Sequence, residues 1–234
     1  MLWADDLFVV SQSAERLQNA IDRVYDFYTT LGLQLNVKKT KVMIFNKFGR
    51  VLGGYSFTMN KIQLEQTNSY QYLGIKLRPS GSLTLAAEEL CVKARKAWFS
   101  ISSILYKNKR MSVQRAFKLF DSLVSPVALY ACEFWLPHVL PNKCFSSKTC
   151  MLAGWERFKC ETINQQCSRL LLSVHRKASR LAVLGELGHY PLATKAMAHT
   201  LNYRLCLSKK PANSLIGLAM AEMGDMARQG KDCC

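Results

Sequence analysis

The sequence lacks the closely spaced cysteines and histidines that form a structural zinc site. Its nine cysteines include Cys144 with Cys150 and the adjacent pair Cys233 and Cys234, and no two have the Cys-x-x-Cys spacing of a zinc finger. The four histidines show no ligand spacing and are interpreted as ordinary helix or turn residues: His138, His175, His189 and His199. We expect the cysteines to be reduced thiols that serve mainly in packing.

Long apolar runs are also missing. No segment reaches the roughly 18 apolar residues that a membrane span needs, and the first residues do not combine a charged stretch with an apolar stretch, as secretory signals do. Internal repeats and low-complexity tracts are absent as well. We therefore expect a soluble protein of the nucleus or cytoplasm with no membrane partner, and its 49% hydrophobic content is enough for one or two packed domains.

Acidic side chains are scarce relative to basic ones. The 234 residues contain 32 Lys and Arg but only 16 Asp and Glu, a formal net charge of +16. Such an excess favours a polyanionic partner, and nucleic acid is the first candidate. Residues 1–80 carry 10 basic and 6 acidic side chains, whereas residues 81–234 carry 22 and 10. Most of the positive charge therefore lies in the middle and end of the chain.

The first 80 residues have the pattern of a strand pair, a helix and further strands. Residues 2–4 and 7–10 are apolar runs on either side of Asp5 and Asp6, which predicts a hairpin with both aspartates at its tip. Apolar residues at helical spacing then run from Ser13 to Gly32 and predict an amphipathic helix. Residues 33–45, 55–64 and 70–77 are rich in strand-forming residues, and glycines and the pair Asn60-Lys61 mark turns between them.

From residue 81 onward the spacing of apolar residues is helical. Ser112 is placed to cap a second helix, and Ser125 followed by Pro126 has the pattern of an N-cap and first-turn proline that begin a third. Residues 136–149 contain two prolines and a polar cluster, which predicts a linker. Four further helices are expected over residues 150–230, with breaks near Arg176, residues 188–191 and Pro211. The predicted fold class is α+β.

The paired carboxylates suit one chemical task. Mg²⁺ prefers hard oxygen ligands and keeps room for substrate phosphates, and two such ions about 3.5 to 4 Å apart can clamp the attacking and leaving oxygens of phosphoryl transfer. Asp5 and Asp6 at a hairpin tip fit this chemistry. The alternative is a solvated type I′ turn with no ligand.

The residues around this pair favour the metal interpretation, because three motifs follow one another in the order that they have in a known family. These are Trp3-Ala4-Asp5-Asp6, then Gly32-Leu33 with Asn36, Lys39 and Thr40, and then Tyr72-Leu73-Gly74. Together they resemble the second half of the palm of reverse transcriptases from non-LTR, LINE-type retrotransposons. The stretch LGELGHYPLATKAM, residues 184–197, is more weakly similar to the region after the thumb in these elements.

The resemblance implies a role for each motif. Asp5 would be the direct Mg²⁺ ligand and Asp6 a secondary one, because successive strand side chains face opposite ways. Lys39 would lend charge or a proton to the leaving pyrophosphate, or is simply a solvated lysine. Tyr72, Leu73 and Gly74 would form the primer grip, with Gly74 allowing close approach of a primer backbone. An ordinary strand glycine at a bend is the alternative for Gly74.

The helices after residue 80 would resemble the polymerase thumb, which grips the template and primer. Lys93, Lys96 and Arg115 are candidate phosphate-binding residues within a group of eight basic side chains. A generic solvated basic face is the alternative. RNA template, DNA primer and deoxynucleotides are the partners that the resemblance implies.

We therefore expect a partial palm over residues 1–80, thumb-like helices over 81–135, a linker over 136–149 and a helical C-terminal region over 150–234. The chain would be a truncated RNA-directed DNA polymerase that ancestrally copied RNA into DNA by two-metal nucleotidyl transfer. Catalytic competence is doubtful, because the fingers and an earlier aspartate-bearing palm strand of the family have no counterpart in the chain. The alternative functional hypothesis is a non-catalytic, basic nucleic-acid-binding remnant of a transposable element.

Overall fold

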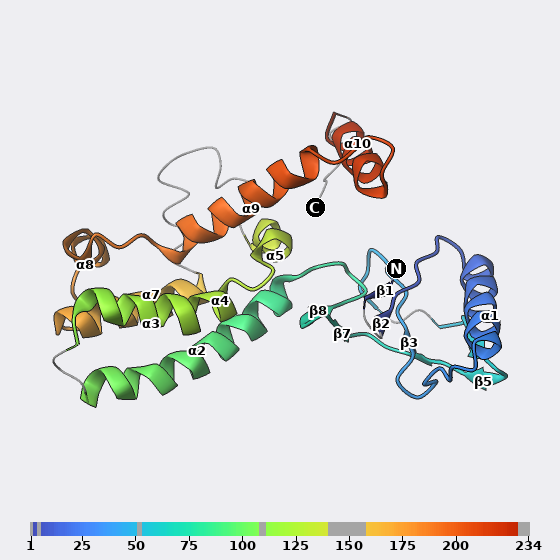
Figure 1. Ribbon diagram of the computed structural model, residues 1–234, viewed down its shortest axis with the longest axis horizontal. Helices are drawn as coiled ribbons and strands as arrows, with labels where there is room; N and C mark the ends of the chain where they lie inside the picture. Colours follow the sequence, from blue (N-terminus) through green and yellow to red (C-terminus); the bar gives the residue numbers. More distant parts are fainter. Residues whose placement is uncertain (1, 4–5, 51–52, 108–110, 140–157, 229–234) are drawn as a thin grey trace. The chain divides into compact units, whose positions relative to one another are not determined.

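The structure, a computed structural model, describes residues 2–3, 6–50, 53–107, 111–139 and 158–228. The chain divides into two compact units, residues 1–82 and residues 83–234. Short strand pairs and one long helix make up the first unit, and helices make up the described part of the second (Figure 1). The α+β fold class predicted from the sequence is therefore confirmed.

The N-terminal unit contains helix α1 (Ala14–Thr30) and short two-stranded ladders. Three ladders are antiparallel: β1 (Leu2–Trp3) with β2 (Asp6–Leu7), β4 (Thr58–Met59) with β5 (Ile62–Gln63), and β7 (Tyr70–Tyr72) with β8 (Ile75–Leu77). The fourth pairs β3 (Lys41–Val42) parallel with β6 (Glu65–Gln66), and an ion pair joins Lys41 to Glu65. Residues 33–45 were expected to be β-rich, but only Lys41–Val42 pair as a strand.

Local sequence sets both ends of α1. Ser13 has extended backbone angles and its side chain accepts a hydrogen bond of 3.3 Å from the backbone N–H of Arg16, as an N-cap does. At the other end Gly32 has a φ of +71°, and Leu33 donates its N–H to the carbonyl of Tyr28. This is the Schellman ending that glycine favours. The predicted helix from Ser13 to Gly32 is thus confirmed.

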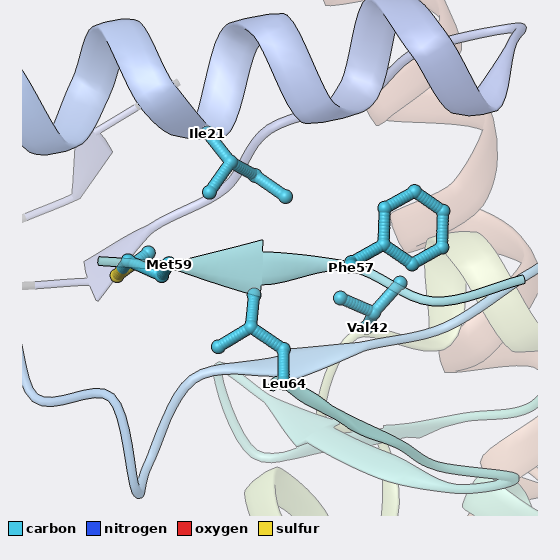
Figure 2. Packing of buried hydrophobic residues seen from close by; sticks show 5 residues of the cluster. All are labelled: Ile21, Val42, Phe57, Met59 and Leu64. Atoms are coloured by element: carbon cyan, nitrogen blue, oxygen red, sulfur yellow. The ribbon is translucent and has the colours of Figure 1, made fainter. Parts of the chain in front are cut away.

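A small apolar core joins α1 to the strands beneath it. Ile21 points from the helix toward the segment that carries Phe57 and Met59, and Val42 and Leu64 lie on the far side of that segment (Figure 2). These five side chains are at most 7% exposed. The side-chain amide of Gln18 adds a polar link, because it donates to the carbonyl of Thr58 at 2.8 Å and accepts from the N–H of Thr58 at 3.0 Å. These two hydrogen bonds fix the position of α1 along β4.

The C-terminal unit is built from helices. Their bounds are α2 (Thr84–Lys107), α3 (Val113–Leu123), α4 (Ser125–Ala128), α5 (Cys132–Val139), α7 (Lys159–Leu172), α8 (Arg180–Leu187), α9 (Leu192–Ser208) and α10 (Leu215–Arg228). Helices α2, α3 and α7 pack on one another, and α5 packs along α9 (Figure 1). Large buried side chains at these contacts are Trp98, Phe120, Trp135, Ile163 and Leu192. The predicted breaks near Arg176, residues 188–191 and Pro211 all fall between helices.

Two local predictions in this unit need correction. Ser112 caps α3 as expected, with its Oγ accepting from the N–H of Arg115 at 3.4 Å, but Ser125 is the first residue of α4 and not its cap. Residues 136–139 were expected to begin a linker, but they are the last residues of α5. Pro137, one of the two prolines that predict the linker, lies within that helix. The rest of the expected linker, residues 140–149, lies outside the described residues. The functional division into palm, thumb and C-terminal region stays a prediction.

The expectation of reduced cysteines is also corrected at one place. Cys91 of α2 and Cys160 of α7 form a disulfide, with their Cα atoms 5.2 Å apart. The two residues are 69 positions apart in the sequence, so only the packing of α2 on α7 brings them within bonding distance. Three other described cysteines are free thiols: Cys132, Cys167 and Cys206. Burial raises the pKa of Cys132 and of Cys167 to about 12, so both fit the predicted packing role.

The described helices are each shorter or less apolar than a membrane span, so none of them taken singly could cross a bilayer. Two consecutive segments, Val113–Ala128 and Cys132–Val139, meet the criterion only when joined across a 71° bend.

Candidate functional site

The first candidate residues lie in the hairpin formed by β1 and β2. Trp3 is opposite Asp6 in the ladder, and Leu2 is opposite Leu7. Asp6 is therefore a strand residue, not a turn residue as predicted, because the ladder register pairs it with Trp3. Its side chain is exposed. Asp5, the expected direct metal ligand, lies outside the described residues.

An aromatic contact connects this hairpin segment with the hairpin of β7 and β8. The ring of Phe8, two residues after Asp6, stacks on the ring of Tyr72 with centroids 5.1 Å apart and planes 29° apart. Both side chains are partly buried. Aromatic pairs in this offset arrangement stabilise a contact by about 0.5–1.5 kcal/mol beyond the burial of area. Two motifs that are more than 60 residues apart in the sequence thus lie together in the N-terminal unit.

The turn between β7 and β8 has an unusual backbone. Tyr72 pairs with Ile75, so Leu73 and Gly74 form the two-residue connection, and their φ angles are +46° and +82°. Positive φ at both positions is the type I′ geometry, which favours Asn and Gly. A leucine there costs roughly 1–2 kcal/mol, and Leu73 is 40% exposed. Burial of this side chain therefore does not offset the backbone strain. Strained backbone conformations of this kind cluster at functional sites.

Lys39, the third predicted catalytic residue, lies in a tight turn before β3. Its backbone N–H donates to the carbonyl oxygen and to Oδ1 of Asn36, both at 3.1 Å, and the hydroxyl of Thr40 donates to the same carbonyl at 3.0 Å. Asn36 and Thr40 of the motif thus hold the turn. The Lys39 side chain is exposed, and no interaction among the described residues connects it to Asp6.

The donor chemistry of this hairpin agrees with a magnesium ion. The exposed carboxylate of Asp6 is a hard oxygen ligand, and Mg²⁺ is commonly held by one or two carboxylates together with substrate phosphates and water. No three metal-binding side chains among the described residues converge at Asp6. The described part of the hairpin therefore offers a single protein ligand, and Asp5 is the second candidate.

The predicted phosphate-binding residues lie on α2 and α3. Lys93 and Lys96 are exposed one turn apart on α2, and Arg115 is exposed near the start of α3. Arg115 also lines an open hollow of about 330 Å³, together with Met111, Lys118, Leu119 and Ser122. None of the three candidates forms an ion pair within the described residues.

The acidic residues of the same helices are partly neutralised from the C-terminal region. Glu88 of α2 pairs with Lys159 of α7, and Asp121 of α3 pairs with Lys195 of α9, each at 2.6 Å. Because these carboxylates have lysine partners inside the unit, they cancel less of the positive potential of Lys93, Lys96 and Arg115. Helices α2 and α3 therefore retain a basic surface suited to phosphates.

Sequence reasoning missed a buried polar cluster between α7 and the start of α9. Glu161 is 1% exposed and its Oε1 accepts from the side-chain amide of Asn164 at 2.9 Å. Oδ1 of Asn164 lies 3.2 Å from Nε2 of His189, so His189 carries a proton on that nitrogen. The ring of His189 stacks on Phe117 with centroids 4.0 Å apart. The one sequence signal for the burial of Glu161 is its position among the apolar residues of the same helix, such as Cys160 and Ile163.

Burial dominates the protonation of this cluster. Desolvation raises the pKa of Glu161, against smaller opposing effects from Asn164, the backbone at Ala193 and Leu192, and Arg180. Its second oxygen, Oε2, is buried without a hydrogen bond of ordinary length among the described residues. Desolvation lowers the pKa of His189, as does the nearby positive charge of Lys195, whereas Asp121 acts in the opposite direction. Both groups are therefore biased toward their neutral forms.

Comparison with known proteins gives two matches and one negative result. Residues 1–77 match the model of the family described as reverse transcriptase (RNA-dependent DNA polymerase). A protein of Caenorhabditis elegans described as transposon-derived is 24% identical over 136 residues, which are 57% of this chain and 47% of that protein. The chain thus spans about half the length of this curated relative. No solved structure gives a significant match.

These matches agree with the geometry of the N-terminal unit. The matched segment contains the β1–β2 hairpin, the Asn36–Thr40 turn and the strained turn at Leu73 and Gly74, and the family that it matches acts on nucleic acids. Residues 1–77 are therefore similar to reverse transcriptases, and the chain is related to a transposon-derived protein.

Proposed function

We propose that the chain is part of an RNA-directed DNA polymerase of a non-LTR, LINE-type retrotransposon, with residues 1–80 forming the second half of the palm. The observation that carries this proposal is the stacking of Phe8 on Tyr72. It places the hairpin of Asp6 beside the hairpin of Leu73 and Gly74, so a primer end held at the second hairpin is close to the first.

Each part of the N-terminal unit has a role in this proposal. Asp5 and Asp6 would hold Mg²⁺, and the ion when bound would neutralise phosphate charge on an incoming deoxynucleotide. Tyr72 and the exposed turn of Leu73 and Gly74 support the primer backbone, because Gly74 has no side chain to obstruct it. Lys39, exposed at its turn, supplies positive charge toward the leaving pyrophosphate.

The helices of the C-terminal unit bind the template and primer. Lys93, Lys96 and Arg115 contact phosphates without sequence preference, as exposed cations do. The lysine partners of Glu88 and Asp121 support this role, because they reduce repulsion between those carboxylates and the phosphates.

A second candidate function is a non-catalytic nucleic-acid-binding remnant. The observation that favours it is that no three metal-binding side chains converge at Asp6 within the described residues. By resemblance, two metal ions need a further aspartate besides Asp5 and Asp6, and the described residues place no such third carboxylate beside Asp6. We therefore expect a polypeptide of residues 1–234 to show no magnesium-dependent extension of a DNA primer on an RNA template. Incorporation that disappears in Asp5→Asn would show instead that the site is complete.

Crosslinking distinguishes a palm from a generic basic surface. A DNA primer with a photoreactive 3′-terminal nucleotide is annealed to an RNA template, irradiated with the protein, and the crosslinked peptides are identified by mass spectrometry. We expect crosslinks to residues 70–77 and to the β1–β2 hairpin. The same photoreactive nucleotide in the middle of the duplex should instead label the helices after residue 83. Crosslinks that do not depend on the position of the nucleotide would favour the remnant.

A pair of glycine variants controls for backbone strain. Gly74 and Gly54 both have positive φ angles, +82° and +90°, so alanine strains the backbone at either position. Gly74→Ala should reduce 3′-end crosslinking to residues 70–77, whereas Gly54→Ala should leave it unchanged. Equal loss in both variants would mean that general destabilisation, and not primer contact, is responsible.

A further inference from the structure

Three potential metal ligands converge between α5 and α9 in the C-terminal unit. Cys132 and Glu133 lie in the first turn of α5, and His199 lies in the middle of α9. One ligand atom of each residue lies within 4.8 Å of the other two, and His199 Nδ1 is 3.9 Å from Glu133 Oε1. Among the described residues this is the single such convergence of three side chains.

The two helices hold these residues in a fixed arrangement. Helices α5 and α9 pack closely along each other, and Phe134 and Tyr203 make an edge-to-face contact across them at 5.4 Å. Cys132 is fully buried and its Sγ lies 3.9 Å from the carbonyl oxygen of Ala196, one turn before His199. Ligands on packed helices are positioned more accurately than ligands on loops.

We propose that Cys132, Glu133 and His199 form a zinc site. Thiolate, carboxylate and imidazole are the ligands that Zn²⁺ takes in proteins, at roughly 2.0–2.3 Å. Ligand atoms of a tetrahedral site are then roughly 3.3–3.8 Å apart, so atoms that now lie within 4.8 Å of one another need to close by about 1.5 Å or less. Three protein ligands leave the fourth position for water or for an added ligand.

The surroundings give the ion access from one side. The side chain of His199 is 56% exposed and that of Glu133 is 23% exposed, whereas the side chain of Cys132 is buried. Burial and the charge of Glu133 raise the pKa of the Cys132 thiol to about 12, so the metal-free thiol keeps its proton. When Zn²⁺ binds, the sulfur coordinates as thiolate and one proton passes to solvent. The charges of the thiolate and of Glu133 then balance the charge of the ion.

Cobalt binding to the full chain tests this site directly. Co²⁺ replaces Zn²⁺ as a spectroscopic probe, because thiolate ligation gives charge-transfer absorption in the near ultraviolet and tetrahedral geometry gives intense visible bands. Five other cysteines are first replaced by serine so that they do not compete: Cys144, Cys150, Cys206, Cys233 and Cys234. We expect one equivalent of Co²⁺ to produce both signals and Zn²⁺ to displace it. Binding without charge-transfer absorption would mean an adventitious ion only and would overturn the proposal.

Two variants identify the ligands. His199→Gln should weaken Co²⁺ binding at least tenfold, and its matched control His175→Gln, at an exposed histidine outside the cluster, should not. Cys132→Ser should abolish the charge-transfer band, with circular dichroism verifying that the helices still form. Equal affinities in His199→Gln and His175→Gln would exclude the site. These measurements do not depend on polymerase activity, so the zinc proposal and the proposed function can fail separately.

Discussion

The ring of Phe8 rests on the ring of Tyr72, with the two centroids 5.1 Å apart. Phe8 follows the strand of Asp6, and Tyr72 ends the strand that leads into the strained turn at Leu73 and Gly74. One aromatic pair thus connects the carboxylate hairpin to the turn proposed to hold a primer. The two short ladders cannot hold the hairpins together, because each pairs strands within a single hairpin.

Removal of the Phe8 ring should loosen both hairpins. Phe8→Ala removes a stacking interaction worth about 1 kcal/mol beyond its buried area, so amide hydrogen exchange in residues 6–8 and 70–77 should accelerate by roughly tenfold. Tyr72→Phe keeps the ring and should exchange like the parent. Phe48→Ala, at a ring that is 79% exposed, controls for removal of an aromatic residue in the same unit. Unchanged exchange in Phe8→Ala would mean that the stack contributes no stability.

Nucleic-acid binding should weaken steeply with salt, because binding to phosphates releases counterions. Replacing Lys93, Lys96 and Arg115 together by glutamine should lower the slope of log affinity against log salt by about 0.7–0.9 for each phosphate that is no longer neutralised. The matched control replaces three exposed cations at the end of α9 with the same change of charge: Arg204, Lys209 and Lys210. Fluorescence anisotropy with an RNA–DNA duplex measures both slopes. If the two triple variants behave alike, net charge and not the surface of α2 and α3 determines binding.

Limited proteolysis should remove the N-terminal unit first. Among the described residues, its buried apolar core consists of Ile21 and four others, whereas the C-terminal unit buries several large side chains, among them Trp98, Phe120 and Trp135. Cleavage follows the population of the open form, and a smaller core opens more readily. Mass spectrometry should therefore identify a resistant fragment that begins near residue 83. A protected fragment of residues 1–82 with digested helices would contradict this expectation.

The buried carboxyl of Glu161 should make stability depend on pH. Its pKa is raised in the folded state, so above the ordinary carboxyl range the folded state binds more protons than the unfolded state, and stability falls as pH rises through the folded pKa. Glu161→Gln has no proton to lose. The variant should match the parent near pH 4 and exceed it in stability by an amount that grows toward pH 8.

Guanidinium unfolding followed by tryptophan fluorescence measures this difference, since Trp98 and Trp135 are buried in the same unit. Glu186→Gln, at an exposed glutamate of α8, is the control and should show no such trend. His189, with its lowered pKa, destabilises parent and variant alike as pH falls below its ordinary value, so its contribution largely cancels. A parent more stable than Glu161→Gln at pH 8 would mean that the charged carboxylate is favoured.

The parts of the fold that depend on neighbouring residues were predictable. Ser13 and Gly32 define the ends of α1 through local capping, and Ser112 does the same for the start of α3. The hairpin around Asp6 was predicted, but Asp6 was expected in its turn and instead pairs with Trp3 in the ladder, because ladder register depends on pairing that composition does not specify. Strand content was overestimated after Leu33, where the side chains of Asn36 and Thr40 stabilise a turn instead.

The parts that depend on tertiary packing were not predictable. In the Glu161–Asn164–His189 cluster, two residues of α7 meet a residue of the segment between α8 and α9. His199 meets Cys132 and Glu133 only because α9 packs along α5. The separation of two residues along the sequence does not determine the distance between their side chains in the folded chain. The contact of Phe8 with Tyr72 is of the same kind, because it joins two hairpins that are far apart in the sequence.

The Cys91–Cys160 bond turns 69 residues of sequence into a closed covalent ring that includes most of α2 and all of α3, α4 and α5. A single backbone cut anywhere inside this ring leaves both products attached, and only a reductant separates them. Unfolding is restrained in the same way, because the ring limits the freedom of the denatured chain by about 4 kcal/mol on a chain-entropy estimate. The helices proposed to grip nucleic acid would therefore stay tethered to each other even when they no longer pack together.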